Sequence, residues 1–131
     1  MVEAVGKRIL VVDDASLVRR FYRDALERAG FEVDEALNGV EALEKVLGDS
    51  GSYDLVIVDV NMPQMDGMTF IRTLRRQSEA VSSLPSLVIS TEAGAQDTAA
   101  ARTAGANFYL VKPVSQERLV EHVSIMCGLP T

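Results

Sequence analysis

The chain has 131 residues, 47% of them apolar and 24% charged, which is typical of one soluble globular domain. A formal net charge of −6 gives no general attraction to nucleic acid or anionic lipid, and no apolar run approaches the ~20 residues that a membrane span requires. The N-terminus lacks a secretory cleavage site, and the single cysteine forms no internal disulfide. We therefore expect a cytoplasmic protein with neither nucleic acid nor a membrane as its partner.

Apolar runs of strand length alternate along the chain with segments of helical period. The first strand is predicted at residues 8–12 and the first helix at 16–29, followed by strand 32–36 and helix 40–47. The continuous apolar run at 55–58 is the third strand, and helix 68–76 comes after it. Strand 87–90, helix 95–104, strand 108–111 and helix 115–126 complete the pattern, with surface loops at 48–52 and 78–86.

Five alternating β and α segments predict an α/β fold in which helices cover both faces of a parallel sheet, because parallel strands need crossover connections. Residues that commonly begin or end helices stand at these boundaries. Asn38-Gly39 predicts a turn or cap before the second helix, and Ser115 is the expected N-cap of the last. Gly30 and Gly105 stand where glycine commonly ends a helix.

Polar residues follow the predicted strands at the edge where such sheets bind ligands. They are Asp13, Asp14, Asp59, Asn61, Ser90, Thr91 and Lys112. Each alone is more typical of a turn, a helix cap or a solvated charge. Two carboxylates ~5 Å apart at an effective dielectric of ~20 repel by roughly 3 kcal/mol, so three acids at one edge indicate a cation among them. Oxygen ligands in small number favour Mg²⁺, with phosphate oxygens completing its shell.

Four short motifs stand at the ends of the first, third, fourth and fifth strands: VVDD (11–14), VDVNMPQMDG (58–67), IST (89–91) and VKP (111–113). In this order they resemble the receiver domain of two-component response regulators, particularly the stand-alone chemotaxis kind. The resemblance covers nearly the whole chain. It implies the flavodoxin-like, doubly wound strand order 2-1-3-4-5 and a single receiver domain over residues 1–131.

The resemblance also implies roles for the matched residues. Asp59 corresponds to the phosphoacceptor. The implied Mg²⁺ ligands are Asp13, Asp14, Asp59 and the backbone carbonyl of Asn61. Lys112 corresponds to the cation that pairs with the phosphoryl group, Ser90 to the switch hydroxyl, and Tyr109 to the aromatic residue that turns with the switch.

Four further residues are expected to shape or tune this site. Pro113 resembles the family's cis proline, and Gly67 is expected to permit a backbone angle that other residues resist. Thr91, whose β-branched bulk would hinder access, and Glu92, which with Asn61 is typical of chemotaxis receivers, are expected to change the phosphoryl lifetime in opposite directions.

The implied function is a stand-alone switch, not an enzyme beyond its own phosphorylation and dephosphorylation. A sensor histidine kinase or a phosphotransfer protein would donate the phosphoryl group. A downstream protein would bind the family's fourth helix, fifth strand and fifth helix, here residues 95–104, 108–111 and 115–126. We expect a monomer, with dimerisation on phosphorylation left open. Arg19, Arg20 and Arg23 are expected to form a solvated basic face, with kinase docking as the alternative.

Three other functions remain open at this point. One is a phosphorelay shuttle, and another is a Mg²⁺-dependent phosphatase or phosphotransferase that works through an aspartyl phosphate. Such enzymes usually need a further general acid and a cap that closes on the substrate, and the sequence has no insertion long enough to form a cap. The third is a degenerate receiver that acts only as an interaction module, although the acceptor and the acids are all present.

Overall fold

The computed structural model describes residues 6–48 and 53–129, so most of the predicted loop 48–52 lies outside the described residues. The strands are β1 (Arg8–Val12), β2 (Glu32–Ala36), β3 (Leu55–Val58), β4 (Ser86–Ser90) and β5 (Phe108–Val111). The helices are α1 (Ser16–Arg28), α2 (Gly39–Leu47), α3 (Gly67–Arg75), α4 (Glu79–Ser82), α5 (Ala95–Ala104) and α6 (Gln116–Met126).

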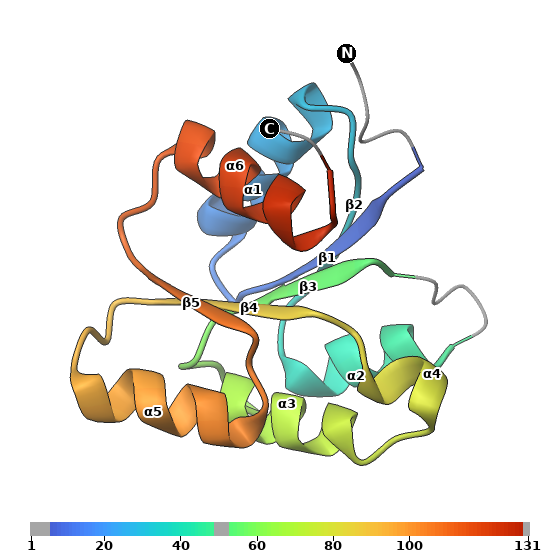
Figure 1. Cartoon of the computed structure of the whole chain (residues 1–131), viewed down its shortest axis with the longest axis vertical. Helices are drawn as coiled ribbons and strands as arrows, with labels where there is room; N and C mark the ends of the chain where they lie inside the picture. Colours follow the sequence, from blue (N-terminus) through green and yellow to red (C-terminus); the bar gives the residue numbers. More distant parts are fainter. Residues whose placement is uncertain (1–5, 49–52, 130–131) are drawn as a thin grey trace.

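The five strands form one parallel sheet in the order β2-β1-β3-β4-β5, which confirms the predicted flavodoxin-like fold. Figure 1 shows α1 and α6 on one face of this sheet and α2, α3, α4 and α5 on the other. Strands β1 and β3 are neighbours, and Val12 of β1 pairs with Val58 of β3. The residues that follow these two strands therefore leave the sheet at the same edge.

The central strand β3 is buried along its whole length. Leu55 and Ile57 belong to the apolar core beneath α1 and α6, whereas Val56 and Val58 belong to the core beneath α2, α3 and α5. Burial on both faces explains why this run shows no alternation of apolar and polar residues. Asp59, the residue that follows β3, is therefore attached to a rigid strand that is shielded from solvent.

The predicted helix ends are confirmed. Asn38 Oδ1 accepts the N–H of Glu41 at 2.9 Å at the start of α2, and Ser115 Oγ accepts the N–H of Arg118 at 3.1 Å at the start of α6. Gly30 and Gly105 adopt φ values of 102° and 116°, the left-handed region in which glycine ends a helix without strain. No helix within residues 6–48 and 53–129 has the length and apolarity needed to cross a membrane.

The prediction of five helices is wrong in one segment, because α4 forms a single helical turn where a loop was expected. None of its four residues is buried, so no apolar period marks it in the sequence. The guanidinium of Arg75 donates to the carbonyls of Ser82 at 3.0 Å and Leu84 at 2.7 Å. This tertiary contact holds a turn that is too short to be stable alone.

Candidate functional site

Three carboxylates lie together at the carboxyl edge of the sheet. Asp13 and Asp14 follow β1, Asp59 follows β3, and one oxygen from each lies within 4.8 Å of the others. Asp13 is only 2% exposed, whereas Asp14 is exposed to solvent. The pairing of β1 with β3 immediately before the acids brings them together.

Lys112 carries a positive charge to these acids from the end of β5. Its Nζ lies 3.3 Å from Asp13 Oδ2 and 3.7 Å from Asp59 Oδ1. The peptide bond between Lys112 and Pro113 is cis, as the resemblance implies. One ammonium group faces three carboxylates, so the edge keeps a negative charge and an oxygen donor set of the kind that binds a hard divalent cation.

The electrostatics of Asp59 reflect this crowding. Burial raises the pKa of Asp59, and the neighbouring Asp13 carboxylate raises it further. The ammonium of Lys112 and the N–H of Val60, which donates to Asp59 Oδ1 at 2.9 Å, lower this pKa. Burial and the charges of Asp13 and Asp59 also raise the pKa of the Tyr22 hydroxyl. The carboxylates at this edge therefore have too little positive charge beside them, and a bound cation would supply it.

Ser90 and Tyr109 are both hydrogen-bonded to Glu92, which follows β4. Ser90 is fully buried, and its Oγ accepts the N–H of Glu92 at 3.1 Å. The hydroxyl of Tyr109 donates to the carbonyl of Glu92 at 2.7 Å. Thr91 and Asn61 are exposed. Within the described part of the chain, the Ser90 hydroxyl has no direct hydrogen bond to Asp59 or to the Lys112 side chain, whereas the backbone N–H of Lys112 donates to the Ser90 carbonyl at 2.8 Å.

Gly67 is required for a different reason from the one expected. It does not have a positive φ; that backbone conformation belongs to Gln64, at 67°. A Cβ atom on Gly67 would overlap the carbonyl oxygen of Asp59 and lie 2.8 Å from Val58 Cγ1. The glycine therefore allows α3 to begin directly against the backbone of Asp59.

The expectation of a solvated basic face on α1 is wrong for Arg19. Its side chain is 11% exposed, with Nε 2.7 Å from Glu35 Oε1. Its Nη1 donates to the backbone carbonyl of Asp13, also at 2.7 Å. The helical period places Arg19 on the same side of α1 as Tyr22 and Leu26, the only sign of this contact in the sequence.

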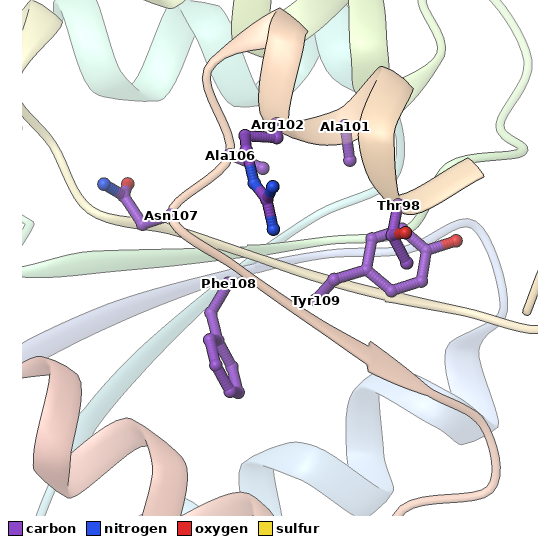
Figure 2. Close-up of a pocket in the computed structure, with 7 residues that line it drawn as sticks. All are labelled: Thr98, Ala101, Arg102, Ala106, Asn107, Phe108 and Tyr109. Atoms are coloured by element: carbon purple, nitrogen blue, oxygen red, sulfur yellow. The ribbon is translucent and has the colours of Figure 1, made fainter. Parts of the chain in front are cut away.

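Two hollows border β5 and the residues on either side of it. The first, here called the α1 groove, has a volume of about 320 Å³ and is lined by Leu17, Val18, Phe21, Tyr22, Lys112, Pro113 and Val114. The second, the α5–β5 pocket, has a similar volume and is lined by Thr98, Ala101, Arg102, Ala106, Asn107, Phe108 and Tyr109. Figure 2 shows Tyr109 beside Thr98 of α5, while Phe108 points from β5 in the opposite direction.

Known proteins resemble this chain over most of its length. The family model described as the response regulator receiver domain matches residues 9–124. The chemotaxis protein CheY1 of Helicobacter pylori is 38% identical over 122 residues, which cover 92% of this chain and 97% of that protein. The sensor protein EvgS of Escherichia coli is 40% identical over 116 residues, which are 9% of its length. The structure of the chemotaxis protein CheY4 of Vibrio cholerae matches with a TM-score of 0.85 and 34% identity, covering 92% of this chain and 98% of that one.

Proposed function

Because this chain belongs to the response regulator receiver family, we propose that it is a switch that accepts a phosphoryl group on Asp59 and thereby changes its binding to a downstream protein. The observation that carries this proposal is the meeting of three carboxylates with one ammonium group at the carboxyl edge of the sheet. The buried strand β3 holds the nucleophilic carboxylate in a fixed position, which favours attack. We take residues 1–131 as one receiver domain.

The donor set fits magnesium, because Mg²⁺ binds through few carboxylates and keeps water molecules and phosphate oxygens as its other ligands. Asp13, Asp14 and Asp59 would hold it through their side chains. The backbone carbonyl of Asn61, on the loop after β3, is the fourth proposed ligand. When bound, the ion neutralises negative charge on the phosphoryl oxygens.

Asp59 takes the phosphoryl group from a phosphohistidine of a sensor histidine kinase or a phosphotransfer protein. A bond forms between a carboxylate oxygen and phosphorus, the bond from phosphorus to the imidazole nitrogen breaks, and that nitrogen takes up a proton. Asp59 Oδ1 accepts the N–H of Val60. Asp59 Oδ2 has no hydrogen-bond partner among the described residues, and we assign it as the attacking oxygen. Lys112 pairs with the charge on the transferred group.

Switching follows from the contacts of Glu92. Ser90 Oγ accepts the N–H of Glu92, so its own hydroxyl hydrogen is available to the phosphoryl oxygens. A shift of Ser90 toward the phosphoryl group would release the Glu92 N–H and displace the carbonyl that Tyr109 binds. Phosphorylation at one edge thereby reaches an aromatic residue in the α5–β5 pocket. Thr91 and Glu92 set how long the phosphoryl group persists.

Separate surfaces suit the two protein partners. The α1 groove lies beside Lys112 and presents the exposed side chains of Leu17 and Phe21 to the phosphoryl donor. The target binds the face of α5, β5 and α6, the structural counterparts of the family's fourth helix, fifth strand and fifth helix. Because α5 buries only Ala101 and Ala104, a displacement of this helix loses little apolar contact. We propose that the chain acts as a cytoplasmic monomer in chemotaxis, the process named in its relative CheY1.

Incubation with Mg²⁺ and acetyl phosphate, followed by intact-mass measurement, tests this function. We expect one phosphoryl group per chain, lost with a chelator and in Asp59→Asn. Continuous hydrolysis of many phosphoesters would instead favour the aspartyl-phosphate phosphatase, and transfer onward to a second histidine protein would favour a relay shuttle. The absence of any adduct would favour an interaction module. Light scattering of the same samples reports whether phosphorylation produces a dimer.

A further inference from the structure

Arg19 of α1 contacts the backbone of the acidic loop from within the protein. The residue is 9% exposed, although arginine is almost never fully buried without a partner. Nη1 donates to the carbonyl of Asp13 and Nε donates to Glu35 Oε1, both at 2.7 Å. The guanidinium therefore joins the end of β1 to β2, the strand on the outer edge of the sheet.

The carbonyl that Arg19 holds belongs to the peptide group between Asp13 and Asp14. A peptide group is planar, so fixing its oxygen fixes the direction in which the chain leaves Asp13 and enters Asp14. Asp13 is held elsewhere as well, since its N–H donates to the carbonyl of Ala36 at 3.1 Å and its Oδ1 accepts the N–H of Ala15 at 2.9 Å. Asp14 has no hydrogen-bond or ion-pair partner within residues 6–48 and 53–129. The peptide orientation is thus the main constraint on where its carboxylate points.

The partner of Arg19 is itself held in place. Glu35 Oε2 lies 3.1 Å from Arg23 Nε, without the alignment of a hydrogen bond. Arg23 Nη2 donates to the carbonyl of Val33 at 2.6 Å. Glu35 therefore keeps a positive neighbour even when Arg19 is replaced, so such a variant does not leave a partly buried carboxylate unpaired.

Arginine is specifically suited to this position. Its planar fork presents Nε and Nη1 in fixed directions, which allows one side chain to serve Glu35 and the Asp13 carbonyl together. Lysine keeps the charge but carries a single ammonium group on a flexible stem. Arg19→Lys therefore separates the effect of the fork from the effect of the charge.

We propose that Arg19 is a positioning residue that orients the peptide between Asp13 and Asp14 so that both carboxylates reach one divalent cation. This inference rests on the proposed function, because it concerns the magnesium site of the same switch. It differs from a purely structural role of Arg19. A structural role would change the stability of the chain and leave the affinity of its folded state for Mg²⁺ unchanged.

The test is Mg²⁺ affinity, measured by calorimetry on the full chain for wild type, Arg19→Lys, Arg19→Gln and Arg20→Gln. Arg20 is the matched control, because it is the next residue on the same helix and is exposed. We expect both Arg19 variants to bind Mg²⁺ about 10-fold more weakly, the usual effect of removing a group that orients a metal ligand, and Arg20→Gln to bind like wild type. The second readout is the rise in Tm that Mg²⁺ produces, which should be smaller in the Arg19 variants.

The outcomes distinguish the positioning role of Arg19 from the proposed function of the chain. If wild type binds Mg²⁺ and folded Arg19→Lys and Arg19→Gln bind it equally well, the positioning role is overturned and the proposed function stands. If the Arg19 variants have a lower Tm but Mg²⁺ raises it as much as in wild type, the positioning role is also overturned and Arg19 is a structural residue. If wild type itself binds no Mg²⁺, the proposed function fails and the role of Arg19 fails with it. Equal weakening in Arg20→Gln would show a general loss of charge and also overturn the proposal.

Discussion

The side chain of Asp59 is only 11% exposed, and its carboxylate lies close to those of Asp13 and Asp14. Burial first, and then the charge of Asp13, raise its pKa above the ordinary value. A raised pKa means that the folded state binds the proton more tightly than the unfolded state does. Ionising Asp59 at neutral pH therefore lowers the free energy of unfolding. Such a loss of stability is common where a site must hold a reactive charge.

We predict that Asp59→Asn raises the free energy of unfolding at pH 7 without divalent ions, because it removes a carboxylate whose charge is disfavoured by burial and by Asp13. Wild-type stability falls as the pH rises from the ordinary carboxyl pKa of 3.8 toward the raised pKa of Asp59, whereas asparagine does not titrate. The difference in free energy of unfolding between the variant and wild type should therefore be largest at pH 7 and small near pH 3.8. Urea unfolding at both pH values, with a chelator, measures it. A variant less stable than wild type at pH 7 would contradict the prediction.

The residues that the sequence reveals are those whose position depends on chain topology alone. Asp13, Asp59 and Lys112 each follow a strand, and parallel strands bring such residues to one edge whatever their side chains do. Arg19 is different, because its burial depends on Glu35, a residue of another strand, and the helical period of α1 does not specify that pairing. The sequence predicts that a glycine is needed at position 67, but it does not predict why. The requirement comes from the close approach of α3 to Asp59, which is a tertiary contact.

Among the elements, α3 is tied to the strands by Arg75, at its C-terminal end. The guanidinium donates to carbonyls of Ser82, Leu84 and Gly105, the last from both Nε and Nη2, and also to Ser86 Oγ and the side-chain oxygen of Asn107. All these acceptors are neutral, and burial lowers the pKa of Arg75. One side chain thus connects α3, α4, β4 and the turn before β5, at the sheet edge opposite the acids.

We predict that Arg75→Met lowers the free energy of unfolding by about 2–4 kcal/mol, because several partly buried carbonyls lose their donor at once. Methionine keeps much of the length of the side chain, so the loss reports the hydrogen bonds more than the packing. Arg76→Met is the matched control, since Arg76 is the adjacent residue and is exposed, and it should change stability by less than about 0.5 kcal/mol. Equal effects of the two substitutions in urea unfolding would show that Arg75 has no special role.

Only some of the apolar residues of helix α1 belong to the core. In the predicted helix 16–29, apolar residues recur every three to four positions, but the structure buries Tyr22, Ala25 and Leu26 and leaves Leu17 79% and Phe21 42% exposed. Residues that build the core and apolar residues that stay exposed follow the same helical period, so the sequence does not separate them. Their separation becomes visible only when α6 and the loop at Pro113 are placed beside α1.

We predict that Leu17→Glu slows phosphotransfer from a phosphorylated histidine protein at least about 10-fold, since a loss of ~1.4 kcal/mol in docking gives that factor. Labelling by acetyl phosphate, which needs no docked protein, should stay as in wild type. Ile125→Glu is the matched control, because Ile125 is 58% exposed on α6 and lies outside the α1 groove. The two transfer rates are measured with radiolabelled phosphoryl groups. If Leu17→Glu slowed both reactions alike, its effect would be on the site and not on docking.

At the scale of the molecule, the alternation of strands and helices is enough to predict a parallel sheet, since no other arrangement accommodates helical crossovers of this length. The order of the strands is not contained in that pattern and came from the resemblance of the strand-end motifs. The order matters for function. With β1 and β3 adjacent, Asp13 and Asp59 follow paired strands, and their repulsion is built into the fold.

A cation that relieves this repulsion binds the folded chain far more tightly than the unfolded chain, because unfolding separates Asp59 from the adjacent Asp13 and Asp14. We therefore predict that Mg²⁺ at about 100 times its dissociation constant stabilises the protein by about 2.7 kcal/mol, which for 131 residues raises Tm by roughly 8–10 °C. Asp14→Asn should lose most of this rise, whereas Asp24→Asn, which removes an exposed acid of α1, should keep it. Thermal unfolding with Mg²⁺, against NaCl of equal ionic strength, measures the effect. A rise of the same size with NaCl would mean that general screening, and not a bound ion, relieves the acids.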